Sequence, residues 1–157
     1  SPYIGPIIKL FCKDGDLALQ VHRSLLEPSS KLLSMAKDHG TKTEIRLNDI
    51  SQEAGHVLVH FLYTKTYRCL RSNDSVTQGR QLAEFRACLE CYVTARKYAL
   101  SNLETLMQTE LERLSTEITV PNLIAILEEL CPRPSQDDKW FPCFVESCVQ
   151  RAFDDPQ

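Results

Sequence analysis

Two pairs of side chains in this sequence have a spacing that could support chemistry. Cys88 and Cys91 form a Cys-x-x-Cys pair, and His56 and His60 stand four residues apart. The cysteine spacing is typical of redox-active dithiols, and two histidines one helical turn apart can share a zinc ion. Together these four residues define one hypothesis, a thiol- or metal-dependent protein.

The sequence around both pairs favours a structural interpretation instead. Redox cysteines usually stand at the start of a helix, where the helix dipole lowers the thiol pKa, whereas Cys88 and Cys91 fall inside the apolar pattern of a predicted helix. The histidines, in the segment His-Val-Leu-Val-His, have no Glu between them. We therefore expect the cysteines to be small core residues and the histidines to be exposed or to face a groove, in a position that a partner protein could contact.

The remaining polar residues carry no recognisable catalytic pattern. The serines lack a nucleophile-elbow sequence, and the five glycines are isolated along the chain, so they form no phosphate-binding loop. We therefore expect no catalytic residue, no cofactor, no metal ion and no enzymatic activity.

Composition narrows the class of protein further. The 157 residues suit a single domain, with 43% apolar and 25% charged residues and a net charge of −3. Basic residues are scattered among acids, so we expect no binding to nucleic acid, and apolar runs are too short to cross a membrane. Seven cysteines, most of them at apolar positions, and no visible signal peptide predict reduced thiols in the cytoplasm or the nucleus.

The elements that would position these residues predict an α+β fold. Asp14-Gly15 is typical of a tight turn between two strands. Apolar residues at helical spacing recur through the rest of the chain, so we expect a small β-sheet flanked by a helical cluster. The expected strands cover residues 7–13, 17–21 and 43–47, and helical turns are expected over 24–37. The expected helices begin at Asp49 or Ser51, either of which can cap the helix, near Leu82, at Ser101, at Val120 and near Phe141. Ser101 and Glu104 match a capping box, and the prolines at 132 and 134 are expected to end the helix that begins at Val120. A loop is expected over residues 65–80, with a short strand at 67–70.

Four segments occur in an order and spacing that resemble the BTB/POZ domain, especially the BTB proteins of fungi. They are Val-His-Arg-Ser-Leu-Leu at 21–26, Thr-Glu-Ile-Arg-Leu-Asn-Asp-Ile at 43–50, Phe-Leu-Tyr-Thr at 61–64 and Ala-Arg-Lys-Tyr-Ala-Leu-Ser-Asn-Leu at 95–103. The resemblance implies a BTB/POZ domain over residues 7–116, followed by a helical extension over 117–157 that packs on it or follows it.

The resemblance also implies a module that binds other proteins. Its expected partners are a second copy of the chain, in a homodimer, and a cullin, for which the chain would be a substrate adaptor of a ubiquitin ligase. The alternative is an oligomerisation domain of a transcriptional co-regulator. The residues matching the family's dimer face are Ile4, Ile7, His22, Arg23 and Leu26, and those matching its cullin face are Met35, Lys37, Asp38 and Tyr63. The chain departs from the family where Lys37 replaces the usual Glu and where Ile7 or Ile8 replaces the usual Asp.

Overall fold

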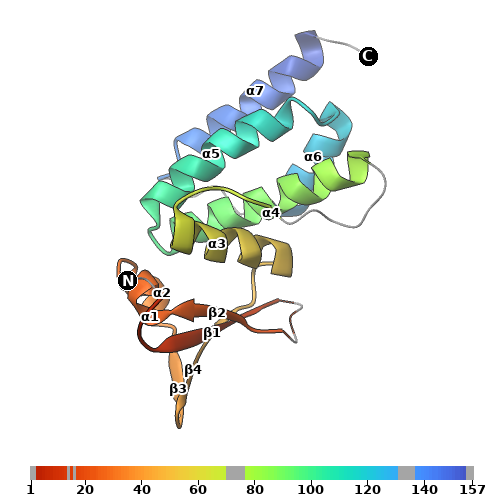
Figure 1. Cartoon of the computed structure of the whole chain (residues 1–157). Coiled ribbons are helices and arrows are strands. Elements are labelled where there is room, and N and C mark those ends of the chain that lie inside the picture. Colours follow the sequence, from red (N-terminus) through yellow and green to blue (C-terminus); the bar gives the residue numbers. More distant parts are fainter. Residues whose placement is uncertain (1–2, 14, 16, 70–76, 131–136, 155–157) are drawn as a thin grey trace.

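The computed structural model of the chain describes residues 3–13, 15, 17–69, 77–130 and 137–154. These residues form a four-stranded sheet and seven helices (Figure 1). The α+β class predicted from the sequence is therefore confirmed. In chain order the elements are β1 (Ile7–Cys12), β2 (Leu19–His22), α1 (Arg23–Leu26), α2 (Ser30–Leu33), β3 (Lys37–His39), β4 (Lys42–Leu47), α3 (Gln52–Thr64), α4 (Thr77–Lys97), α5 (Ser101–Ser115), α6 (Val120–Leu130) and α7 (Trp140–Asp154).

The sheet has the strand order β2-β1-β4-β3, with β1 antiparallel to β2 and parallel to β4. Alternate residues of each strand point to opposite faces. Among the described elements, the helices cover one face and lie above the sheet in Figure 1. The residues on the covered face are buried and form the sheet's share of the core: Ile8, Leu10, Cys12, Val21, Ile45 and Leu47.

The segment after Leu33 differs from its prediction. Helix α2 ends at Leu33, and β3 replaces the last helical turns that were expected up to residue 37. β3 pairs antiparallel with β4, and Gly40, with a φ of 68°, reverses the chain between the two strands. The strand forms because β4 supplies backbone partners from beyond the turn, which outweighs a helical preference that is weak in so short a segment.

Helix α3 lies directly on the sheet. Of the two predicted caps, Ser51 is the one used: its hydroxyl accepts a hydrogen bond from the Ala54 N–H at 3.2 Å. The Glu90 carboxylate from α4 in turn accepts hydrogen bonds from the Ser51 N–H at 2.8 Å and the Ser51 hydroxyl at 2.6 Å. Gly55 permits the close approach, because a Cβ at this position would lie 2.4 Å from the Cys12 Sγ atom.

The longer helices agree with the predicted pattern but differ at their ends. Helix α4 begins at Thr77, earlier than expected, and α5 begins at Ser101 with Leu100 as its N-cap. The predicted capping box at the start of α5 is therefore wrong: the Glu104 side chain pairs with Arg96 of α4, at 2.7 Å, instead of turning back to the helix start.

Two predicted features fall wholly or partly outside the described residues. Residues 67–69, the described part of the expected short strand, form no strand. The rest of that segment and the proline-rich stop after α6 lie in residues 70–76 and 131–136, which the structure does not describe.

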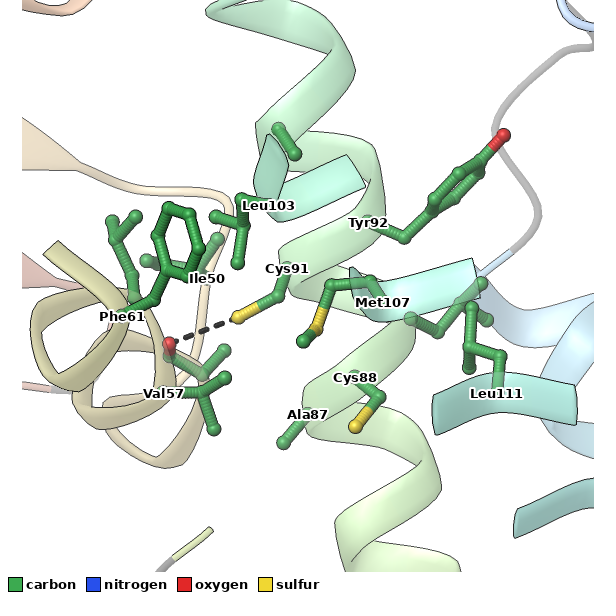
Figure 2. Close-up of a cluster of buried hydrophobic side chains, with 14 of the residues drawn as sticks. Ile50, Val57, Phe61, Ala87, Cys88, Cys91, Tyr92, Leu103, Met107 and Leu111 are labelled. Carbon is green, nitrogen blue, oxygen red and sulfur yellow. Dashed lines mark hydrogen bonds between the residues drawn. The ribbon is translucent and has the colours of Figure 1, made fainter. Parts of the chain in front are cut away.

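The core is centred between α3, α4 and α5. Figure 2 shows side chains of Val57 and Phe61 from α3 facing Cys91 of α4 and Leu103 and Met107 of α5. These side chains are at most 5% exposed. The Cys91 thiol donates a hydrogen bond to the Ala54 carbonyl of α3 at 3.1 Å, so even its weak donor is used inside the core.

Candidate protein-interaction surface

Exposed apolar side chains gather where the N-terminal segment meets α3. Tyr3, Ile4 and Ile7 are 65%, 72% and 48% exposed. The Tyr3 ring stacks on the Tyr63 ring of α3, with centroids 5.4 Å apart and planes within 12°. Ile7 pairs with His22 across β1 and β2. We call this group, Tyr3, Ile4, Ile7, His22 and Tyr63, the aromatic corner.

The Tyr63 hydroxyl fixes the geometry of the corner. Its oxygen accepts a hydrogen bond from the His22 backbone N–H at 3.1 Å and lies 2.6 Å from the His22 Nδ1 atom. A tyrosine hydroxyl can accept one hydrogen bond and donate another, so the Tyr63 proton can be donated to Nδ1 while the oxygen accepts the His22 N–H. The His22 ring also stands edge-on to both tyrosines, at 86° to Tyr3 and 87° to Tyr63. The base of the corner is thus held by both hydrogen bonds and ring contacts.

The five residues predicted for a dimer face are not all at the surface. Ile4, Ile7 and His22 lie in the aromatic corner, and Arg23, which is exposed, follows directly at the start of α1. Leu26 is 0% exposed and belongs to the core, so its place in a contact surface is corrected: it supports α1 from below and cannot touch a partner.

The four residues predicted for a cullin face are divided between elements. Lys37 and Asp38 are exposed on β3, and Asp38 accepts a hydrogen bond from the Thr43 hydroxyl at 2.7 Å. Met35 is half-buried and packs against the core. Tyr63 lies on α3 in the aromatic corner, beside residues predicted for the other face.

Sequence reasoning did not find Tyr3. Its contact with Tyr63 joins residues sixty positions apart, and no local spacing indicates such a pair. Ile4 and Ile7 were named for the dimer face through the BTB/POZ resemblance alone, and both lie at the surface.

The cysteine pair lies inside the core, as the structural interpretation predicted. Cys88 and Cys91 are 0% and 1% exposed. Burial raises the pKa of Cys88 to about 12 and that of Cys91 well above the usual range. Because the thiolate is the reactive form, neither residue is a nucleophile near neutral pH.

The histidine pair shows no ligand geometry. His56 and His60 are half-buried on α3, and the His60 Nε2 atom lies 3.0 Å from the Thr66 hydroxyl. Within the described part of the chain, no three or more His, Cys, Asp or Glu side chains come together as metal ligands would.

A partly buried polar cluster surrounds Tyr67, after α3. The Tyr67 hydroxyl donates to Glu84 of α4 and accepts from the Cys88 thiol at 3.3 Å. Arg113 of α5 reaches Glu84 at 3.5 Å. Burial raises the pKa of Tyr67, so its hydroxyl keeps its proton. The cluster ties the segment after α3 to α4 and α5 and has the character of a structural network.

An open groove of about 430 Å³ runs between α5 and α7. Its polar groups are already engaged in holding α7: Arg151 donates to the Ser115 carbonyl at 2.6 Å, and the Trp140 indole N–H donates to Glu112 at 3.2 Å.

No described helix is long and apolar enough to cross a membrane.

Relatives of the chain occur among fungal proteins. Over 107 residues it is 26% identical to subtelomeric hrmA-associated cluster proteins from two strains of Aspergillus fumigatus. The match covers 68% of this chain and 27% of each relative, so the chain spans about a quarter of the length of the relatives it matches.

A match to a family model overturns the BTB/POZ interpretation. Residues 21–118 match the family described as the HAC6 N-terminal domain. The BTB-like segments misled because many of their residues serve needs common to small α+β folds: Leu26, Ile45 and Leu62 are buried core residues. Such positions specify local packing and do not distinguish one family from another. Since the match covers more than half of the sequence, the chain belongs to the HAC6 N-terminal domain family.

Proposed function

We propose that this chain is a protein-interaction domain without catalytic activity, and that it contacts its partner through the aromatic corner. The observation that supports this proposal is the exposure of Tyr3, Ile4 and Ile7 beside a fixed His22–Tyr63 pair. Clustered apolar side chains at a surface are typical of contact sites between proteins.

The chemistry of the corner suits such a contact. Tyr63 and Tyr3 combine flat apolar rings with polar groups, a combination that is enriched in contacts between proteins. The hydrogen bonds of Tyr63 are made within the chain, so a partner would meet a preformed surface and lose little conformational entropy in binding it.

Self-association through the corner is the form of this function that we propose to test first. Light scattering on the purified chain over a range of concentrations should show a mass that rises above the monomer. Ile4→Ser and Tyr3→Ser should each weaken this association. The matched control is Leu17→Ser, because Leu17 is 75% exposed, close to the 72% of Ile4, but lies outside the corner.

The outcomes distinguish self-association of the chain from recruitment of a different protein. A strictly monomeric mass would remove self-association, and a photo-crosslinker placed at position 4 or at position 17 would then test for a different protein partner. A defined adduct from position 4, absent from position 17, would support recruitment of that partner. If the chain does not self-associate and position 4 gives no adduct, the proposal is overturned.

A cullin is not part of this proposal, and neither is a transcriptional co-regulator. Both partners were implied by the BTB/POZ resemblance, which the family match replaces. The exposed side chains of the aromatic corner support the proposal without either partner.

A further inference from the structure

The second face of the sheet is open and unlike the rest of the molecule. The helices cover one face, so the side chains that point away from them form what we call the outer sheet face (Figure 1). The strand register places them on the same side of the sheet. They are Ile7, Lys9 and Phe11 of β1, Gln20 and His22 of β2, Lys37 and His39 of β3, and Lys42, Glu44 and Arg46 of β4.

This face is cationic, although the whole chain is acidic. Among the described strand residues it carries four cationic side chains, Lys9, Lys37, Lys42 and Arg46, against one carboxylate, that of Glu44. The chain has a net charge of −3. The acids concentrate elsewhere: residues 101–157 contain eleven Asp and Glu but four Lys and Arg.

The single carboxylate leaves most of this positive charge uncompensated. Glu44 stands opposite Lys9 on one neighbouring strand and opposite Lys37 on the other. Its oxygen also lies 3.8 Å from Arg46, whose side chain remains 64% exposed. The Arg46 guanidinium rests over the Phe11 ring, 4.7 Å from its centroid, so a cation and an aromatic surface are presented together.

We infer that the outer sheet face binds an extended acidic segment of a partner protein. Lys9 and Lys37 lie two strands apart, about 10 Å, and Arg46 lies about 8 Å diagonally from each of them. Carboxylates at alternate positions of an extended peptide repeat about every 7 Å, so the long, flexible side chains of these three residues can close the difference and reach them. Lys9 separates Ile7 from Phe11 on β1, so an apolar side chain of the segment would contact one of these two residues.

Two other occupants fit less well. A nucleic acid carries a phosphate at every nucleotide and would place one against Glu44, whereas an acidic peptide can present a neutral residue there. A symmetric dimer through this face would place two cationic faces against each other, and like charges repel. The inference rests on the proposed role as a protein-interaction domain, because it specifies the chemistry of a partner. The outer sheet face adjoins the aromatic corner, since Ile7 belongs to both.

The test measures binding of a short acidic probe to the whole chain. Fluorescence anisotropy would follow a labelled peptide of about eight residues with alternating Glu and Ser, which spans about 26 Å when extended. The charge control is the same peptide with Lys in place of Glu. We expect binding of the Glu peptide alone, and a loss of affinity as salt rises.

A charge-reversed variant locates the site. Lys9→Glu combined with Lys37→Glu should weaken Glu-peptide binding about tenfold or more, because two attractive pairs become repulsive. The matched control is Lys31→Glu combined with Lys139→Glu, which makes the same change in charge at exposed positions off this face. We expect it to change affinity less than about twofold.

Several results would overturn the inference. They are no binding of the Glu peptide, equal binding of the Lys peptide, or an equal loss in both double variants. A single-stranded oligonucleotide that binds more tightly than the peptide, with the same dependence on Lys9 and Lys37, would identify a nucleic-acid surface instead. Self-association lost in the Lys9 and Lys37 variant, without competition by the peptide, would identify a second copy. If the Glu peptide does not bind but the chain still associates through Ile4, the inference fails and the proposed function stands.

Discussion

At the scale of single residues, the Tyr63 hydroxyl connects α3 to β2. It accepts a hydrogen bond from the His22 N–H at 3.1 Å and lies 2.6 Å from the His22 Nδ1 atom. Tyr63→Phe leaves the ring in place but removes both contacts, so we expect the free energy of unfolding to fall by about 1 kcal/mol in urea denaturation. His22→Ala removes the imidazole ring and its Nδ1 contact but keeps the backbone N–H bond to Tyr63. The losses of stability in His22→Ala and Tyr63→Phe should therefore be non-additive in a double-mutant cycle. Strictly additive losses would contradict direct coupling.

Buried thiols predict how stability responds to pH. Burial raises the pKa of Cys12 to about 11 and that of Cys88 to about 12, from a usual value of 9.0. Groups that hold a proton more tightly in the folded state add stability that is fully present below pH 9.0 and is lost as the pH rises through 11 to 12. We therefore expect the free energy of unfolding to decline progressively above about pH 9.

Urea denaturation of reduced protein at several pH values would measure this decline. Cys88→Ala should make the decline shallower, whatever it does to stability at neutral pH. Cys143→Ala is the matched control, because Cys143 is exposed on α7 and its removal should leave the slope unchanged. Equal slopes in both variants would contradict the role of the buried thiol.

At the scale of elements, the seat of α3 on the sheet depends on Gly55. A Cβ there would lie 2.4 Å from the Cys12 Sγ atom and 2.9 Å from a Leu19 methyl carbon. Gly55→Ala should therefore lower the free energy of unfolding by about 1–3 kcal/mol, although Ala favours a helix by about 1 kcal/mol. Adding Cys12→Ala removes the nearest atom and should recover part of the loss. A stabilised Gly55→Ala variant would show that α3 can move away from the sheet freely.

Helix α7 is attached to α4 through Asp138. One carboxylate oxygen caps α7 by accepting hydrogen bonds from the Trp140 and Phe141 N–H groups at 3.1 and 3.0 Å. The other accepts from the Tyr92 hydroxyl at 2.7 Å and lies 3.3 Å from Arg96 Nε. Asp138→Ala should destabilise the protein by about 2 kcal/mol or more.

The single tryptophan reports this change directly. Trp140 contacts Tyr92, with ring centroids 5.1 Å apart, so its fluorescence should shift when α7 loosens. Asp137→Ala is the control, since Asp137 is the exposed neighbour in sequence, and it should change stability by less than about 0.5 kcal/mol. Equal effects of the two variants would contradict the proposed attachment.

The same scale shows what the sequence could predict. Periodic apolar residues located α3, α5 and α6, because their packing faces are encoded every three to four positions. β3 was missed because its stability comes from pairing with β4, and the capping box failed because Glu104 has a better partner in Arg96. Long-range partners decided both cases, and a local pattern contains no information about them.

At the scale of the whole molecule, the sequence predicted the α+β class but not the family or the surface. The aromatic corner brings Tyr63 to His22 across forty-one positions, and it mixes residues assigned to two separate predicted faces. The outer sheet face depends on register, which places Lys9, Glu44 and Lys37 side by side. Neither arrangement can be inferred before the strand order is known.

The family match covers less than the folded unit. It runs over residues 21–118 and so leaves out β1, the strand that pairs with both β2 and β4, as well as α6 and α7. Residues 117–157 were predicted as a helical extension, and their described helix α7 covers buried rings of α4. Phe85 stacks on Phe144 with ring centroids 6.5 Å apart, and Tyr92 stacks on Phe141 with centroids 5.8 Å apart. Phe85 and Tyr92 are 0% and 2% exposed in the complete arrangement.

A chain shortened to residues 1–118 should therefore lose more than its last two helices. Removing α6 and α7 uncovers Phe85 and Tyr92, so we expect a lower melting temperature, increased binding of a hydrophobic dye and aggregation. A chain ending at Asp154 keeps α7 and should melt like the full sequence. A 1–118 chain that unfolds cooperatively at the temperature of the full sequence would show instead that residues 117–157 are a separable extension, because their contacts with α4 would then contribute nothing to the stability of the sheet and the central helices.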